Sequence, residues 1–291
     1  MFTIAFRFRP SLGVLVVASL LVGATPAVRA SDISFVTIFK NIDYEQTSNV
    51  SSSSALSLNG TFFSADLFSK TANAYGSASV MLPDGSSIAL TQNTPADYGF
   101  QTGLLADQAT MDAMFPFGTY TFTGVNGPQT DTATLNYTAD DYSQTVPFLT
   151  GNTYSALQGL NAAQSFTFGL SPFTPGGNQT DAFVFLTVFN QSTGDVAFTQ
   201  GFLNPSTTSI TMGAGQLDPG TAYSYELDFS DRDIASDLNG AEFPPQIGFD
   251  VRTDGTFTTA AAVAATPEPS SLVLLGTGLL AAFGGIRRRF A

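Results

Sequence analysis

The sequence predicts an all-β protein in which antiparallel strands form two β-sandwiches. Short runs rich in Val, Ile, Phe, Thr and Tyr are interrupted by Gly, Pro, Asn and Asp at intervals of roughly 8–12 residues, a spacing typical of sandwiches. Several runs, such as residues 120–123 and 165–169, alternate large and small side chains, which indicates strands with one buried face. Only residues 102–114 suggest anything else, and we expect a short helix or a structured loop there.

The two sandwich domains are expected over residues 31–146 and 147–257, and residues 258–266, rich in Ala, Thr and Val, are expected to be a spacer. In the first domain, Asp84-Gly85 provides the turn of a hairpin. The boundary falls where polar residues precede Pro147 and a new series of strands begins. The chain has 27 phenylalanines and no tryptophan. We expect these rings to fill two thin cores, because burying one Phe is worth about 1.5–3 kcal/mol.

The second domain contains a more specific pattern. The string Leu-Asp-Pro-Gly-Thr-Ala-Tyr over residues 217–223 leads into a strand and resembles the corner of a fibronectin type III or related immunoglobulin-like module. The resemblance extends over roughly residues 147–259. It implies a tyrosine corner in which the Tyr223 hydroxyl bonds to backbone upstream. The tryptophan often found early in such modules is missing, and Phe166 or Phe168 is expected in its place.

The N-terminus is typical of a secretory signal peptide. Arg7 and Arg9 precede an apolar run over residues 12–24, and small residues end in Val28-Arg29-Ala30. We expect residues 1–30 to form a signal helix that is cut before Ser31. Because Arg29 lies inside the cleavage site, an uncleaved N-terminal anchor is the alternative.

A second apolar segment, residues 270–286, carries no charge and is followed by Arg287, Arg288 and Arg289. A helix of this length, at about 1.5 Å per residue, just crosses a hydrocarbon core of roughly 30 Å. The three arginines are expected to stop transfer and stay cytoplasmic, which places the preceding chain outside the cytoplasm. The sequence therefore predicts membrane attachment through a C-terminal transmembrane helix.

Pro267-Glu268-Pro269 lies directly before this apolar segment. Pro-Glu-Pro, a short apolar helix and a terminal arginine cluster together resemble the PEP-CTERM sorting signal of Gram-negative bacteria, here over residues 267–291. The resemblance implies that an exosortase-type membrane protease recognises Pro267, Glu268 and Pro269. It also implies a transient inner-membrane anchor and a final location at the cell surface or outside the cell. The alternative is an ordinary anchor behind a stiff proline linker.

Charge excludes one class of partner. The chain has 23 acidic and 10 basic residues, and between residues 31 and 266 the basic ones are Lys40, Lys70, Arg232 and Arg252. A surface of this sign repels phosphate backbones, so nucleic acid is not expected as a partner. Such a surface either attracts divalent cations or simply keeps an exported protein dispersed.

The chain contains no cysteine and no histidine. Disulfides, thiol nucleophiles, Cys-ligated zinc, the usual Ser-His-Asp triads and zincin sites are therefore excluded. Carboxylate pairs are compatible with glycoside hydrolysis, but no spacing in the sequence indicates such a pair. We expect no enzymatic activity and no obligatory cofactor.

One acidic segment is a candidate calcium site. Its oxygen-bearing residues are Asp228, Asp231, Asp233, Asp237, Asn239 and Glu242. Counted from Asp231, the third position of a calcium loop is Asp233, and the ninth and twelfth are Asn239 and Glu242. The fifth and sixth positions are Ala235 and Ser236, where a ligand and a glycine are expected, so the segment departs from the EF-hand pattern. A looser calcium site and a solvated loop with Arg232 as counter-ion remain open.

These observations predict a non-enzymatic surface or extracellular-matrix protein that is sorted by exosortase and associated with exopolysaccharide or biofilm. The alternative is a carbohydrate- or calcium-binding module on the cell surface. Tyr137, Tyr142 and Tyr154 are candidates for a sugar-stacking platform, although tyrosines on strands more often pack in cores.

Overall fold

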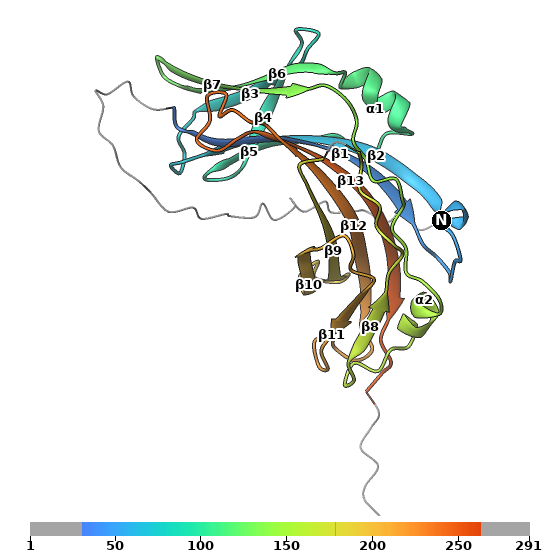
Figure 1. The fold of residues 1–291 in the computed structure, drawn as a ribbon. Coiled ribbons are helices and arrows are strands. Elements are labelled where there is room, and N and C mark those ends of the chain that lie inside the picture. Colours follow the sequence, from blue (N-terminus) through green and yellow to red (C-terminus); the bar gives the residue numbers. More distant parts are fainter. Residues whose placement is uncertain (1–30, 178, 263–291) are drawn as a thin grey trace, which may run out of the picture. The chain divides into compact units, whose positions relative to one another are not determined.

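The computed structural model describes residues 31–177 and 179–262, and this part of the chain is all-β (Figure 1). The predicted signal peptide, the sorting residues and the C-terminal apolar segment lie outside the described residues. Within the described residues, no helix combines the length and apolar character needed to span a bilayer. The sequence-based prediction of an all-β fold is confirmed.

Most strands belong to one large sheet. Its members are β1 (Ile33–Glu45), β2 (Ser57–Ser69), β3 (Ser77–Met81), β4 (Ser87–Thr94), β5 (Asp97–Gln101), β6 (Gly118–Asn126), β7 (Gln129–Tyr137), β9 (Asp181–Asn190), β10 (Val196–Leu203), β12 (Ala222–Ile234) and β13 (Gln246–Thr258). Their order is β10-β9-β12-β13-β1-β2-β5-β4-β3-β6-β7. A second, two-stranded sheet pairs β8 (Phe166–Gly169) with β11 (Ser209–Met212). The helical elements are α1 (Gln108–Met114), α2 (Thr153–Leu157) and the 3-10 turn η1 (Ser53–Ala55).

One strand pairing differs from the expected antiparallel arrangement. β1 and β13 run parallel, with Thr37 opposite Gln246 and Glu45 opposite Asp254. Hairpins force antiparallel pairing because the chain turns back on itself. The Thr37 side chain donates to the Gln246 carbonyl across 209 residues of sequence, so no hairpin constrains the direction of this pair.

The first core is enclosed because the large sheet folds over itself. The sheet bends at β4, where residues 87–90 pair with β3, whereas Thr91 and Gln92 pair with β5. Strands that change partner in this way make the corners of sandwiches. Side chains from β1, β2 and β5 then meet those from β3, β6 and β7, and Met111 of α1 and Phe115 directly after the helix belong to the same core. Phe115 stacks on Phe63 with a ring-centroid distance of 3.9 Å.

The second core lies between β9, β12 and β13 on one side and β8, β11 and α2 on the other. Alternate residues of β9, namely Val184, Leu186 and Val188, are fully buried in it. Phe168 of β8, one of the two residues expected to replace the missing tryptophan, is also completely buried there. Alternation along the sequence therefore identified the buried face of these strands correctly.

The tyrosine corner is confirmed. The backbone N–H of Asp218 donates to the Tyr223 hydroxyl at 2.8 Å, and the Tyr223 side chain is 1% exposed. The hydrogen bond ties the turn before β12 to the strand itself. The Asp84-Gly85 hairpin is confirmed as well, with Gly85 at a φ of +86°.

The two cores share strands. β13 contributes Ile247 and Phe249 to the first core and Phe257 to the second. Buried Gln46, just after β1, accepts from the Leu149 N–H at 2.8 Å and from the Tyr225 hydroxyl at 3.1 Å. Side chains from the first half of the chain therefore complete hydrogen bonds in the second half.

The start of the expected spacer is bonded to this body. The Thr259 N–H donates to the Thr221 carbonyl at 3.0 Å, and the Ala260 N–H donates to the Leu160 carbonyl at 2.8 Å. Residues 263–266 of the spacer lie outside the described residues. The division into domains at residues 146 and 257 stays a prediction.

Candidate functional site

The acidic segment expected to bind calcium begins at the end of β12. Asp231 is completely buried, and one of its oxygens accepts from the Gly176 N–H at 3.2 Å while the other has no hydrogen-bond partner. Burial raises the pKa of Asp231 to about 7. Burial and the nearby Asp141 raise the pKa of Asp233 to about 6. These two carboxyl groups are therefore easier to protonate than ordinary aspartates.

The remaining residues of the segment point elsewhere. Asp237 and Asn239 are exposed, and the Asn239 carbonyl accepts from the Thr134 N–H at 2.9 Å. Glu242 forms a surface ion pair with Lys70 at 3.6 Å. Over residues 31–177 and 179–262, no three Asp, Glu, His or Cys residues are close enough together to hold a metal ion. Calcium binding by this segment stays a prediction.

Arg232, the expected counter-ion of that segment, lies against β13 and β1. Its guanidinium is 2.7 Å from Asp250 and lies 4.5 Å from the centre of the Phe39 ring. Gly248 makes this possible, because a Cβ at that position would overlap both Phe39 and Arg232. The positive charge of Arg232 therefore pairs with Asp250 on the neighbouring strand β13.

A second arginine organises the densest charge network on that sheet. Arg252 is 3.2 Å from Asp43, 3.3 Å from Asp254 and 3.7 Å from Glu226. Its guanidinium also lies 5.2 Å from the centre of the Phe62 ring. Burial raises the pKa of Asp228, directly opposite Arg252 on β12, and Arg252 opposes that shift.

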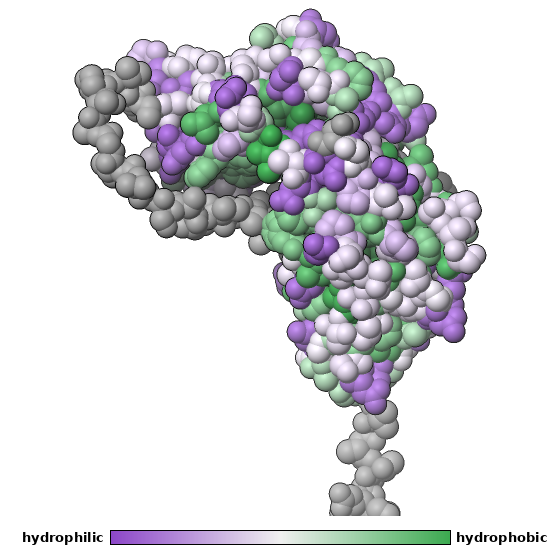
Figure 2. Space-filling model, viewed as in Figure 1, coloured by the Kyte–Doolittle hydropathy of each residue, from purple (hydrophilic) through white to green (hydrophobic). Residues whose placement is uncertain are grey.

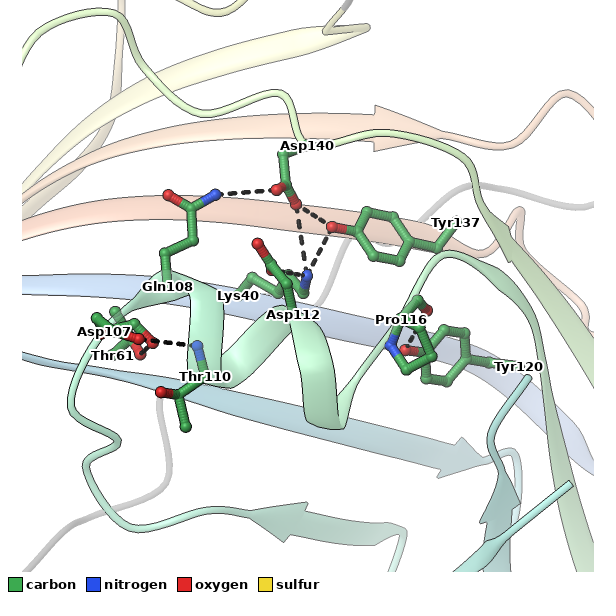
Figure 3. A network of polar contacts seen from close by, with 10 residues as sticks. All are labelled: Lys40, Thr61, Asp107, Gln108, Thr110, Asp112, Pro116, Tyr120, Tyr137 and Asp140. Carbon is green, nitrogen blue, oxygen red and sulfur yellow. Dashed lines mark hydrogen bonds and ion pairs between the residues drawn. The ribbon is translucent and has the colours of Figure 1, made fainter. Parts of the chain in front are cut away.

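The most enclosed charge belongs to Lys40 of β1 (Figure 3). Its side chain is 0% exposed, and its ammonium lies 2.5 Å from Asp112 Oδ1, 2.7 Å from the Tyr137 hydroxyl and 3.5 Å from Asp140 Oδ1. The Tyr137 hydroxyl donates to Asp140, and Gln108 Nε2 donates to the other oxygen of Asp140 at 2.9 Å. Each polar group of the network therefore has a partner of complementary character.

The ends of α1 hold this network in place. Asp107 caps the helix by accepting from the Thr110 N–H at 2.8 Å, and the Thr61 hydroxyl donates to the Asp107 carbonyl at 3.0 Å. After the helix, the Tyr120 hydroxyl donates to the Pro116 carbonyl at 2.9 Å. Anchors at both ends position Asp112 above Lys40 (Figure 3).

The sequence carries a signal for this network in the strand that contains Lys40. Val36, Ile38 and Lys40 lie on one face of an alternating strand, and the first two are core residues. A lysine that continues a buried face must find carboxylate partners. Tyr137, proposed as a sugar-stacking residue, is 0% exposed and packs beside Lys40 instead.

A cavity of about 400 Å³ lies beside β9 and β10. It is lined by Pro175, Gln179, Thr180, Asp181, Ala182, Phe183, Phe202, Asn204 and Pro205. Phe202 is 49% exposed and has a φ of +54°, a left-handed conformation that costs a bulky residue about 1–2 kcal/mol. It lies where the β10–β9 register shifts, and its ring meets Phe183 and Phe185 edge-on at 5.1 and 4.8 Å.

The surface around these sites carries both polar and apolar residues. Figure 2 shows polar and weakly polar residues over much of the visible face, with apolar residues between them. The large exposed apolar side chains include Leu58, Met81 and Phe117 as well as Phe202. Single exposed apolar residues are common in folded proteins, so the cavity with its strained Phe202 is the more specific feature.

Comparison with protein families finds a PEP-CTERM protein-sorting motif over residues 265–289. The predicted recognition residues Pro267, Glu268 and Pro269 and the predicted stop-transfer residues Arg287, Arg288 and Arg289 all lie within it. The resemblance inferred from the sequence is confirmed for this segment.

No curated protein matches the chain. Among solved structures, it is similar to the FN1–FN3 domains of chicken CNTN1 (10% identity, TM-score 0.26, 76% of this chain). It is also similar to the BSP domain of a biofilm-associated protein (16% identity, TM-score 0.21, 71% of this chain). A third similar structure is trypsin-activated α-2-macroglobulin from Escherichia coli (12% identity, TM-score 0.26, 80% of this chain). The chain spans 65%, 28% and 16% of these three proteins respectively.

Proposed function

We propose that this chain is a non-enzymatic exported protein that an exosortase-type membrane protease sorts to the cell surface or the extracellular matrix. The sorting motif over residues 265–289 carries the proposal. Pro267-Glu268-Pro269 is the recognition sequence, residues 270–286 cross the inner membrane transiently, and the three terminal arginines stop translocation. At its destination the protein associates with exopolysaccharide or biofilm material.

The inferred organisation follows from this route. A signal helix over residues 1–30 directs export, two β-sandwiches over residues 31–146 and 147–257 form the exported body, and residues 258–266 separate that body from the transmembrane anchor. Two apolar cores in the described residues support two sandwiches. The shared strand β13 makes them parts of one folded body.

A deletion of residues 267–291 tests the sorting proposal. Exported protein lacking the tail is expected to leave the inner-membrane fraction and to be released into the periplasm or medium. Two matched point variants test whether the Pro-Glu-Pro sequence itself is recognised. Glu268→Gln is expected to leave membrane insertion intact but to reduce processing. Glu242→Gln is expected to change neither membrane insertion nor processing. Unchanged fractionation of the deletion variant contradicts the proposal.

A second function, carbohydrate binding by the exported body, is favoured by the cavity beside β9 and β10. Sugar sites combine an exposed aromatic face with neighbouring polar groups. Phe202 supplies such a face, while Asp181 and Asn204 supply the polar groups. Phe202 lies within the register shift between Gln200 and Leu203, and β-bulges at such shifts often re-aim side chains near binding sites.

Phe202→Ala tests this second function. The variant is expected to weaken binding of the purified full chain to the cell's own exopolysaccharide by roughly threefold to tenfold, because an aromatic contact is worth about 0.5–1.5 kcal/mol. Leu58→Ala, which removes another exposed apolar side chain far from the cavity in sequence, is the control. Equal binding by both variants excludes the cavity as the sugar site.

A further inference from the structure

We propose that Lys40 and Asp112 condense to form an intramolecular isopeptide bond that covalently joins β1 to α1. The inference is independent of sorting and of sugar binding. It makes Lys40 a modification site within the first core, and the bond closes a loop across 72 residues of sequence.

The distance between the two groups suits this reaction. Lys40 Nζ lies 2.5 Å from Asp112 Oδ1, so the two groups are in direct contact. A carboxyl carbon is about 1.2 Å from its oxygen, so Nζ is at most about 3.7 Å from Asp112 Cγ. Reacting atoms about 3–3.5 Å apart form a near-attack arrangement, and well-oriented groups reach effective concentrations of about 10⁵–10⁸ M. Holding the two groups in this arrangement therefore lowers the barrier to amide formation.

The surroundings of Lys40 remove the water that would otherwise reverse the reaction. Its side chain is 0% exposed, and the ring centres of Tyr137 and Phe117 lie 4.5 and 5.7 Å from its nitrogen. Asp112 contacts Lys40 from α1, and its side chain is 32% exposed, which leaves a path for a departing water molecule. Burial also favours the neutral amide over the charged pair.

Asp140 is placed to move the proton. It lies 3.5 Å from Lys40 Nζ, and its two oxygens are held by Tyr137 and Gln108. Because both of its oxygens accept hydrogen bonds from neutral donors, Asp140 stays in position without Lys40. Asp112 lacks such additional holders among the described contacts, which makes it the acceptor and Asp140 the proton carrier.

The reaction balances without an external reagent. Asp140 takes one proton from the Lys40 ammonium and passes it to the carboxylate of Asp112, and the amine lone pair then attacks Cγ of Asp112. Asp140 takes a second proton from the nitrogen of the tetrahedral intermediate and gives it to the hydroxyl, which leaves as one water molecule while the C–N bond stays. Overall, an ammonium and a carboxylate become an amide and water, and Asp140 is regenerated. Asp140 then accepts from Tyr137, Gln108 and the new amide N–H.

Peptide mapping of the full-length exported chain tests the proposal. Denatured protein is digested with a protease that cleaves after aromatic residues, and tandem mass spectrometry is used to search for a branched peptide. We expect a peptide that joins Lys40 to Asp112 and is lighter than the sum of its two parts by one water. Linear peptides alone, with an unmodified Lys40, overturn the proposal, and a branch at Asp140 overturns the assignment of the acceptor.

Variants separate the cross-link from the ion pair. Lys40→Ala leaves the partly buried carboxylates of Asp112 and Asp140 without their cation and is expected to impair folding, so it is not the decisive variant. Asp140→Asn keeps the Lys40–Asp112 pair and one acceptor oxygen for the Tyr137 hydroxyl, and it is expected to retain the circular dichroism spectrum while the branched peptide falls at least tenfold. Glu242→Gln, which breaks the surface pair with Lys70, is expected to leave the branch unchanged. Full branching in Asp140→Asn contradicts the proton-carrier role.

Discussion

At the scale of single residues, the few basic side chains determine which carboxylates of this acidic protein are paired with a positive charge. Lys40, Lys70, Arg232 and Arg252 are all ion-paired, and Lys40 and Arg252 each contact more than one carboxylate. Wholly or partly buried carboxyl groups that form no ion pair with these cations have raised pKa values, as for Asp66, Asp231 and Asp233. The protein is therefore expected to respond to pH through these acids.

Asp66 provides the first prediction. Burial, assisted by Asp97, raises its pKa from 3.8 to about 7. The folded state then binds more protons than the unfolded state between these values, so the free energy of unfolding falls as the pH rises from about 4 to 7. Asp66→Asn is expected to match the wild type at pH 4 and to exceed it at pH 8 by at most about 4 kcal/mol, since one pKa unit is about 1.4 kcal/mol.

Urea unfolding at a series of pH values measures this difference. Asp84→Asn is the control, because Asp84 is exposed and Ser86 lowers its pKa. That variant is expected to leave the slope between pH 4 and 7 as in the wild type. An equal slope in Asp66→Asn contradicts the assignment of the pH response to Asp66.

Two tyrosines give the second prediction. The Tyr223 hydroxyl accepts from Asp218, whereas the Tyr142 hydroxyl is buried without a hydrogen-bond partner. Tyr223→Phe is expected to lower the free energy of unfolding by about 1–2 kcal/mol, because the Asp218 N–H loses its partner. Tyr142→Phe removes an unsatisfied hydroxyl and is expected to cost nothing or to stabilise. Thermal and urea unfolding compare the two, and the reverse order contradicts the tyrosine-corner assignment.

At the scale of elements, the long strands β1, β2, β12 and β13 connect the two cores. Alternation in the sequence located the buried faces of many strands, whereas Gly255 is a residue type that usually weakens the interior of a strand. The structure has one strand, Gln246–Thr258, because Gly255 lies opposite Tyr225 and leaves room for its ring. A glycine that interrupts a pattern can therefore mark a close approach within a strand.

Gly255→Ala is the third prediction. A Cβ at this position would lie 2.5 Å from the Tyr225 ring, which is fully buried and bonded to Gln46. The variant is expected to lose about 1–3 kcal/mol of stability through overpacking. Gly103→Ala, where a new Cβ meets nothing within 4 Å, is the control and is expected to stay within about 0.5 kcal/mol. Equal stabilities of the two variants contradict the packing argument.

At the scale of the whole molecule, the described chain from residue 31 to 260 forms one compact unit with two cores. The parallel pair of β1 and β13 and the hydrogen bonds of Gln46 connect the first half to the second. The sandwiches predicted from the sequence are therefore expected to unfold together.

A truncation provides the fourth prediction. Residues 31–146 alone lack β13, which supplies Ile247 and Phe249 to the first core and covers one edge of β1. This fragment is expected to show no cooperative unfolding in urea, whereas residues 31–262 are expected to unfold in a single transition. A cooperative transition of the short fragment, measured by circular dichroism, contradicts the shared-core interpretation.

The sequence by itself determined the fold class, the tyrosine corner and the sorting motif, because each depends on residues close together along the chain. Alternation reports a buried face, seven consecutive residues encode the corner, and the tail combines Pro-Glu-Pro, an apolar segment and arginines within residues 267–289. The tertiary structure decided the parallel β1–β13 pairing, the surroundings of Lys40 and the cavity at Phe202. These depend on contacts between distant segments: Lys40 meets residues 72 and 100 positions away, and no local pattern specifies which carboxylates a buried lysine will find.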